Sequence, residues 1–293
     1  MWVLAAVGSA LFAGVTSILV KCGIKHADSD VATAVRTGVV LLFAWVVTFI
    51  SGAAGGITAL TAEELTFIAL SGLATGASWI FYFRALSSGS AGKVAAVDKS
   101  STVLTVIAAI IFFGETQNLY LKLACAAAIF IGTLLMIDFK KHAENEESEY
   151  KTNKTWIIYA ALSAIFAALT SIFAKVGMKN VNSNLATALR TGFVLVFAWA
   201  IVFARKKQTE VKNLKGKELG FVLVSGVTTG ASWICYYYAV KFGAVSVVVP
   251  LDKLSIAVTV AFSVIILKER LSVKAWIGFS VILVSTLIMA IFC

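Results

Sequence analysis

The chain repeats itself at a fixed interval of 154 residues (170 minus 16). Residues 16–45, TSILVKCGIKHADSDVATAVRTGVVLLFAW, align without a gap with residues 170–199, TSIFAKVGMKNVNSNLATALRTGFVLVFAW. The pentapeptide TGASW likewise occurs at 75–79 and again at 229–233. An offset that holds over this length indicates that the fold consists of two copies of one unit.

Each copy contains five apolar stretches long enough to cross a membrane, which takes about 20 residues in a helix. The chain is 60% hydrophobic and 14% charged, whereas soluble domains are roughly 45–50% apolar and 25% charged. A transmembrane barrel would instead show alternating segments of about ten residues. We therefore expect an all-α membrane protein with ten transmembrane helices, at about 2–24, 31–51, 65–87, 93–113, 119–138, 155–178, 185–204, 218–241, 245–267 and 273–292.

The number of helices in each copy is odd, so the second copy must enter the membrane from the opposite side. The sequence predicts two inverted five-helix repeats, residues 1–139 and 155–293, joined by a polar linker at 140–154. Inverted repeats are typical of secondary transporters, which bind their substrate between the two halves.

Lysine and arginine are unequally distributed between equivalent loops. Residues 51–64 contain none, whereas residues 205–218 contain six. Because cytoplasmic loops collect Lys and Arg, we expect 205–218 and the linker 140–154 in the cytoplasm, and both termini outside the cell membrane. This placement accounts for the net charge of +10 without nucleic acid, since no basic face is interleaved with stacking aromatics.

Ionisable side chains recur at equivalent positions within the predicted spans. A charge there costs roughly 2.5–3.5 kcal/mol on insertion scales, so each is a candidate functional residue. For Lys21 and Lys175, the alternative is that the side chain snorkels to the lipid head groups. For Asp98 and Arg36, the alternative is an ion pair that only fixes the register of the helices. The cavity candidates from this set are Arg36, Asp98, Lys99, Arg190, Asp252 and Lys253, with Lys21 and Lys175 as further candidates.

Aromatic residues gather in the third and eighth predicted spans, next to a face of small residues. Gly72 and Gly76, like Gly226 and Gly230, have the spacing that lets helices approach closely. Lipid contact or an interfacial belt is the alternative role for the aromatic rings. The side chains expected to flank the cavity are Trp79, Tyr82, Trp233 and Tyr236, with Tyr237 and Arg84 as further candidates.

The repeat architecture, the ten helices and the Gly-Glu and Lys-Glu pairs at Glu115 and Glu269 resemble the drug/metabolite transporter superfamily, in its EamA-like branch. The resemblance covers essentially the whole chain. It implies a metabolite transporter whose cavity lies between helices one to four and six to nine. Members are usually drawn with both termini in the cytoplasm, and the loop charges here predict the opposite.

The sequence thus predicts a secondary active transporter that moves a small anionic or zwitterionic metabolite by alternating access. The alternatives are a lipid or lipid-linked sugar flippase, which the superfamily includes, and a channel or structural membrane protein. An enzyme is not expected, because the spans hold no histidine and no paired carboxylates. No metal or cofactor is expected; the expected partners are a metabolite and the lipid bilayer, while proton coupling and the choice between monomer and homodimer stay open.

Overall fold

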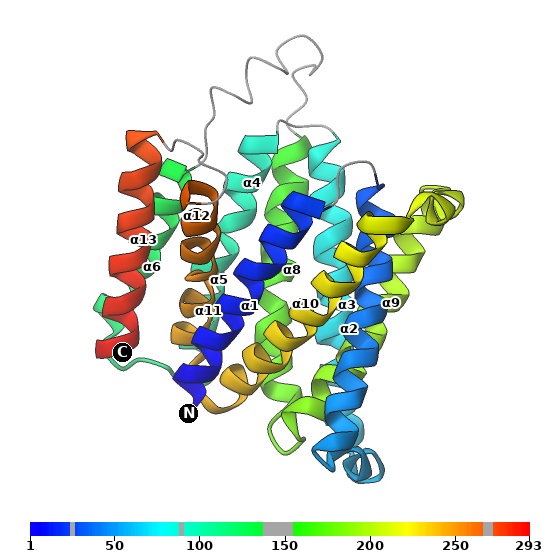
Figure 1. The fold of residues 1–293 in the computed structure, drawn as a ribbon. Coiled ribbons are helices and arrows are strands. Elements are labelled where there is room, and N and C mark those ends of the chain that lie inside the picture. The colour runs from blue at the N-terminus through cyan, green and yellow to red at the C-terminus, as the bar shows by residue number, and fades with distance from the viewer. Residues whose placement is uncertain (24–26, 88–90, 137–154, 266–271) are drawn as a thin grey trace.

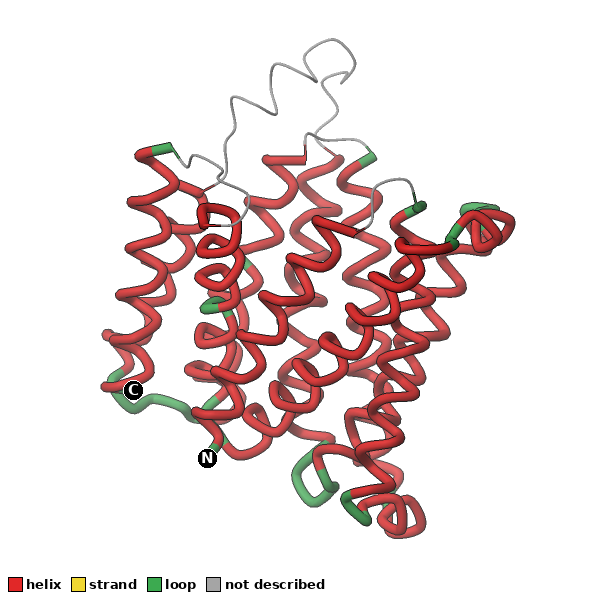
Figure 2. Tube along the Cα trace, in the orientation of Figure 1, coloured by secondary structure: helices red, strands yellow, loops and turns green. Residues whose placement is uncertain are grey.

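The computed structural model describes residues 1–23, 27–87, 91–136, 155–265 and 272–293, so the linker 140–154 and Glu269 lie outside the described residues. The regular elements within these ranges are all helices (Figures 1 and 2). They are α1 (Trp2–Gly23), α2 (Ser29–Ile50), η1 (Ala53–Ala59), α3 (Ala62–Leu86), α4 (Ala91–Lys99), α5 (Ser101–Phe113), α6 (Leu119–Met136), α8 (Thr155–Gly177), α9 (Ser183–Ala204), η2 (Gln208–Asn213), α10 (Gly216–Phe242), α11 (Val245–Asp252), α12 (Ser255–Ile265) and α13 (Val273–Phe292).

Ten segments of this described part are long and apolar enough to cross a membrane. The all-α membrane class predicted from the sequence is confirmed. α1 starts at the end of the molecule that carries both termini, whereas α8 starts at the opposite end (Figure 1). The halves also interlock, because α1 packs on α10 and α3 packs on α8, and α6 packs on α13 at one edge (Figure 1).

The small-residue faces bring helix backbones of opposite halves together, as the glycine spacing predicted. A Cβ built on Gly72 in α3 would lie 2.9 Å from the backbone oxygen of Arg190 in α9. At the equivalent position, a Cβ on Gly226 in α10 would lie 3.1 Å from the backbone oxygen of Arg36 in α2. The glycines therefore hold the backbones of the two arginines in matching positions against α3 and α10.

Replacing Gly76 with valine is expected to destabilise the protein. A Cβ at Gly76 would lie 2.2 Å from the Phe197 ring, and overpacking of this kind typically costs roughly 1–3 kcal/mol. Thermal unfolding in detergent measures the effect. The matched control is Gly220→Ala in α10, where a Cβ meets nothing within 4 Å; equal melting temperatures for the two variants would contradict this packing.

The fourth and ninth spans are interrupted, although the sequence predicted continuous helices there. Pro250 in α11 lacks an N–H and cannot continue the hydrogen-bond pattern, and the N–H of Lys253 bonds the Pro250 oxygen three residues back. Between α4 and α5, the Ser100 hydroxyl donates to the Val97 oxygen at 2.6 Å and competes with the helix. Asp98–Lys99 and Asp252–Lys253 consequently lie at two breaks inside the membrane.

Glu115 joins the two halves at the end of the molecule that carries the termini. Its two carboxylate oxygens each accept a backbone N–H, from Val245 and Ser246, at 2.8 Å. A carboxylate at a helix N-terminus is stabilised by the helix dipole. The fully buried Lys122 donates to the backbone oxygen of Glu115 at 3.0 Å. Glu115 therefore fixes the start of α11. In the sequence it was noted only because it contributes to the family resemblance.

Candidate functional site

A cavity of about 400 Å³ lies between the inverted halves and is called the central cavity below. Its walls come from α1 and α3 of the first half and from α8 to α11 of the second. Ligand pockets usually measure about 300–1,000 Å³, so this one suits a small solute. The predicted site residues that line it are Trp79, Arg190, Trp233, Tyr236, Tyr237 and Asp252.

Arg190 is held rigidly at the wall of the central cavity. Its side chain is buried, its Nε donates to Ser71 Oγ at 2.9 Å, and its Nη2 donates to Thr75 Oγ1. The guanidinium also lies 4.5 Å from the centre of the Tyr237 ring and 5.2 Å from that of Trp233. Its buried Nη1 has no hydrogen-bond partner among the described residues. An unsatisfied buried donor is costly.

Each carboxylate at a helix break is held by a serine from the other half. Ser9 Oγ donates to Asp252 Oδ1 at 3.0 Å and lies 3.2 Å from Ser232 Oγ. Equivalent contacts of 2.8 and 3.3 Å at the other break join Ser163 with Asp98 and with Ser78. Ser9 thus bonds one carboxylate oxygen of Asp252, and Asp252 lines the central cavity.

The Asp98–Arg36 ion pair, which the sequence left open as an alternative, does not form among the described residues. Asp98 instead accepts the Ser163 hydroxyl and lies 3.9 Å from the ammonium of Lys99. Arg36 makes no hydrogen bond or ion pair within the described ranges. The reason is tertiary: α4 packs on α8 of the opposite half, where Ser163 lies within reach of Asp98.

The remaining predicted residues lie away from the central cavity. Lys99 and Lys253 line a second cavity, and Tyr82 packs in a separate apolar cluster beside α8. Arg84 lies 5.9 Å from the centre of the Tyr159 ring. Lys21 is exposed in the last turn of α1, and Lys175 Nζ donates to the Gly243 oxygen. Whether any of these residues binds a solute stays a prediction.

Sequence reasoning missed the hydroxyl groups of the site, because it weighed charge and aromaticity. A signal was available, since several serines and threonines recur at the 154-residue offset inside apolar spans. Two of them belong to the repeated TGASW motif itself. The missed positions are Ser9 and Ser163, Ser78 and Ser232, Thr75 and Thr229, and Ser71 and Ser225.

Equivalent residues of the two halves make different contacts. Arg190 bonds Ser71, whose hydroxyl donates across the halves to the Thr170 oxygen at 2.7 Å. Ser225, the equivalent of Ser71, donates instead to Val222 in its own helix at 2.8 Å. The serine hydroxyl is thus engaged between the halves on one side and confined to its own helix on the other.

A second pair of contacts, made by a tyrosine and a serine, also differs between the two halves. Tyr236 and Ser171 share a hydrogen bond of 2.8 Å between α10 and α8. The equivalent serine, Ser17, donates to the Ala13 oxygen in its own helix at 3.0 Å. Two independent pairs of equivalent contacts are therefore formed on the Arg190 side and replaced on the Arg36 side.

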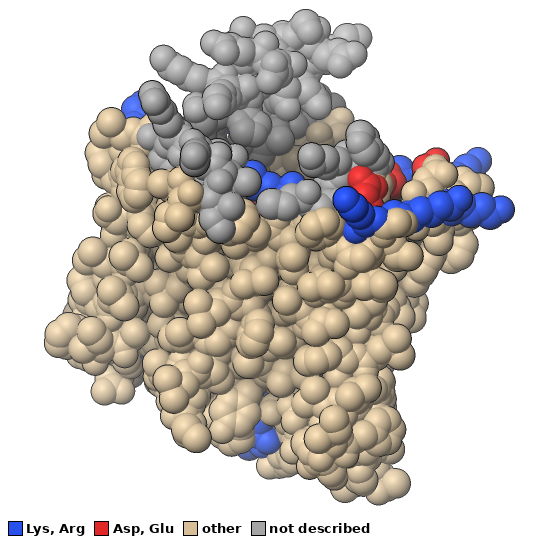
Figure 3. Space-filling view, in the orientation of Figure 1, with Lys and Arg blue, Asp and Glu red and all other residues tan. Residues whose placement is uncertain are grey.

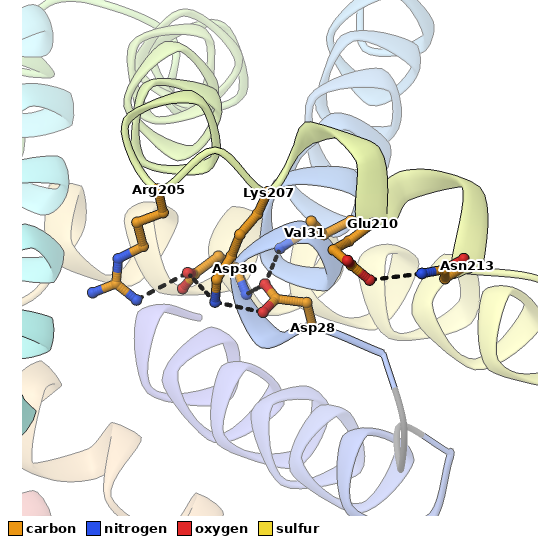
Figure 4. Close-up of polar contacts among 7 residues, drawn as sticks. All are labelled: Asp28, Asp30, Val31, Arg205, Lys207, Glu210 and Asn213. Atoms are coloured by element: carbon orange, nitrogen blue, oxygen red, sulfur yellow. Dashed lines mark hydrogen bonds and ion pairs between the residues drawn. The ribbon is translucent and has the colours of Figure 1, made fainter.

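An ionic network joins the start of α2 to the end of α9 (Figure 4), and none of its residues lines the central cavity. Arg205 bonds Asp30 at 2.9 Å, and Lys207 bonds Asp28 at 2.5 Å and Asp30 at 3.1 Å. Asp28 also caps α2 by accepting the N–H groups of Asp30 and Val31. Charge-assisted hydrogen bonds are the stronger ones, so this network fastens α2 to α9 at this end.

The opposite end of the same helix pair carries a neutral contact. Asn184, the equivalent of Asp30, donates its amide to Ser51 Oγ at 3.2 Å. Ser51 stands at the position equivalent to Arg205. The contacts at the two ends of this helix pair therefore differ in strength, although the residues that make them occupy equivalent positions of the repeat.

Protonation of Asp28 is expected to weaken the ionic network at low pH. Burial raises the pKa of Asp28, but hydrogen bonds from Lys207 and from the backbone of Val31 and Asp30 outweigh it, so the pKa lies below its ordinary value. The stabilisation is therefore present above the ordinary carboxyl pKa and is lost as pH falls through the folded value. Solvent screening keeps the effect to roughly 0.5–1 kcal/mol.

Melting temperatures between pH 3 and 6 measure this effect. Asp28→Asn retains a helix-capping side chain and should show a flatter dependence on pH than the unmodified protein. Identical pH dependence in the two proteins would show that Asp28 does not contribute.

Within the described ranges, no group of three or more His, Cys, Asp or Glu side chains could hold a metal ion. The central cavity combines Arg190 and Asp252 with the aromatic side chains of Trp79, Trp233, Tyr236 and Tyr237.

Comparison with known proteins agrees with a transport role. The EamA-like transporter family matches residues 1–138 and again residues 154–291. An uncharacterized transporter from the cobO 3' region of Sinorhizobium sp. is 44% identical over 110 residues, which cover 38% of this chain and 78% of that protein. A solved crystal structure of 15% identity has a TM-score of 0.77 over 99% of this chain and 96% of its own, a likeness in fold alone. The chain belongs to the EamA-like transporter family, and it is a membrane transporter.

Proposed function

We propose that this protein is a secondary carrier that moves a small zwitterionic metabolite through the central cavity by alternating access. The observation that supports it is the pairing of opposite charges in one cavity. Arg190 and Asp252 both line the cavity, and Nη1 of Arg190 has no partner among the described residues. A solute with one anionic and one cationic group complements both residues at once.

The cavity chemistry favours a carboxylate and an ammonium group on that solute. A guanidinium matches the planar geometry of a carboxylate better than any other side chain does. Asp252, together with the faces of Trp79 and Trp233, offers both charge and cation–π attraction to an ammonium group. The aromatic rings leave room for a modest apolar body, which is the composition of an α-amino acid or a similar zwitterion.

Counterflow in proteoliposomes tests this function. Vesicles loaded with an unlabelled solute should accumulate the labelled form when the solute is a zwitterion. Matched solutes that lack either the carboxylate or the ammonium should exchange poorly, because one buried charge is then left unpaired. Equal exchange of all three classes, or passage of lipid instead, would reject the proposed substrate class and favour the flippase alternative.

The unequal contacts of the two halves support alternating access. In an inverted-repeat carrier, each half adopts the conformation of the other as the site changes sides. The backbone of Arg36 already lies against Gly226 as that of Arg190 lies against Gly72. We infer that Arg36 bonds Ser225 and Thr229 in the opposite conformation, while Arg190 releases Ser71 and Thr75.

We further propose that both termini face outward, as the loop charges predicted. Figure 3 shows Lys and Arg side chains gathered at the end of the molecule where η2 lies, and both termini lie at the other end (Figure 1). Since cytoplasmic surfaces collect these residues, the η2 end is assigned to the cytoplasm.

Thiol labelling of intact cells is expected to reach Cys293 when it is the single cysteine. An impermeant reagent should modify Cys293 directly, because the last helix ends outside. The control, Thr209→Cys in exposed η2, should react only after permeabilisation. The reverse pattern would place the termini in the cytoplasm.

A further inference from the structure

A second cavity, of about 380 Å³, lies beside the two helix breaks and is called the lysine cavity below. It shares no lining residue with the central cavity. Asp252 faces the central cavity, whereas the next residue, Lys253, faces the lysine cavity. Its counterpart from the first half, Lys99, lines the same space. Two cations from opposite halves thus meet at one cavity inside the membrane region.

The ammonium of Lys253 makes no close ion pair among the described residues, although the carboxylates of Asp252 and Asp98 attract it from further away. It makes no hydrogen bond and no ion pair with any residue that the structure describes. Lys99 has Asp98 at 3.9 Å, which is the limit of an ion pair. A cation inside a membrane is expensive and marks a functional site by default. Two ammonium groups line this one cavity, so a bound anion would give them a shared partner.

Two helices also begin at the lysine cavity. Thr102 in the first turn of α5 and Ser255 and Ile256 in the first turn of α12 form part of its wall. A helix N-terminus carries about half a positive charge, and transporters aim the N-termini of broken helices at anionic groups. These helices have 13 and 11 residues, so their dipoles add to the charge of the lysines.

We propose that the lysine cavity binds a phosphate-bearing anion between Lys99 and Lys253. A phosphate group has several acceptor oxygens in a tetrahedral arrangement, and it suits point-like ammonium donors that approach from two sides. The hydroxyls of Thr102 and Ser255 lie in the same wall and can donate to further oxygens. A planar carboxylate fits the guanidinium fork of Arg190 in the central cavity instead. This anion site is separate from the proposed zwitterion site.

A soluble phosphate compound and a phospholipid head group share this chemistry, and the test separates them. Thermal unfolding of the purified protein in detergent is followed as inorganic phosphate replaces chloride at constant ionic strength. Native mass spectrometry of protein purified with phosphatidylglycerol reports the bound lipid. We expect a saturable rise in melting temperature with phosphate, or retention of a phosphatidylglycerol molecule.

The expected effect of Lys253→Gln is a loss of at least tenfold in affinity for phosphate, or loss of the retained lipid. Lys253→Arg should keep most of the binding, and the exposed control Lys274→Gln should leave it unchanged. A phosphate response that needs Lys253 supports the soluble anion, and a retained lipid that needs Lys253 supports the head group. If Lys253→Gln does not fold, Lys99→Gln serves in its place.

The competing role of the two lysines is to neutralise the C-terminal dipoles of α4 and α11. In that case Lys253→Gln lowers the melting temperature but leaves the response to phosphate and the lipid content unchanged. That result, or the absence of both responses in the unmodified protein, overturns the anion site. Neither measurement depends on transport, so failure of the carrier function would leave this test valid.

Discussion

Replacing Arg190 with alanine is expected to abolish binding of the zwitterion and its transport. Arg190 lines the central cavity, its buried Nη1 has no partner among the described residues, and hydrogen bonds to charged groups contribute roughly 1.5–3 kcal/mol each. A carboxylate held by two such bonds would therefore lose at least about 100-fold in affinity. Isothermal titration with the solutes that pass the counterflow test measures the loss.

Two controls separate binding from folding in this experiment. Arg190→Lys keeps the charge but not the planar fork, and should restore only part of the affinity. Arg205→Ala removes an arginine at the molecular surface, outside the central cavity, and should leave binding unchanged. If Arg190→Ala binds the solute normally while melting at a lower temperature, the arginine is structural and the proposed substrate class fails.

Replacing Arg36 with alanine is expected to leave substrate binding intact and to abolish transport. Arg36 does not line the central cavity in the conformation described here. It is proposed to bond Ser225 and Thr229 only in the opposite conformation. A carrier needs two states within a few kcal/mol of each other, so loss of these bonds traps the protein with Arg190 engaged. Titration and counterflow on the same preparation measure the two effects.

A pair of equivalent cavity residues reports the trapped conformation. Ala13 and Ala167 both line the central cavity and stand 154 positions apart. A cysteine at either position is labelled from the outside and from the inside in separate reactions. Arg36→Ala should raise labelling from one side and lower it from the other, and Arg190→Ala should do the opposite. Changes of the same sign in both variants would rule out the exchange.

The sequence by itself determined the ten spans, their division into two units and the inversion of the second unit. These follow from local physics: a span needs about 20 apolar residues, and five crossings end on the opposite side. The glycine faces were also readable, because Gly72 and Gly226 recur at the same place in each unit and packing requires their small size. The cost of a charge in the membrane singled out Arg190 and Asp252 as candidates for the site.

Only the tertiary structure decided which candidates meet. Local hydropathy does not show that the Ser100 hydroxyl helps to end α4, or that Asp98 then bonds Ser163 of the other half instead of Arg36. Hydropathy also does not show that Asp252 and Lys253 line two different cavities, because this depends on the directions of neighbouring side chains at the helix break.

The different contacts of Arg190 and Arg36 are the feature that the sequence predicts least. Both arginines stand in nearly identical segments, each followed by Thr-Gly, and both backbones lie against a glycine of the opposite half. One is nevertheless fully hydrogen-bonded except at Nη1, and the other has no partner among the described residues. Equivalent residues have the same possible contacts in each half, so the tertiary structure and not the sequence decides which contacts form.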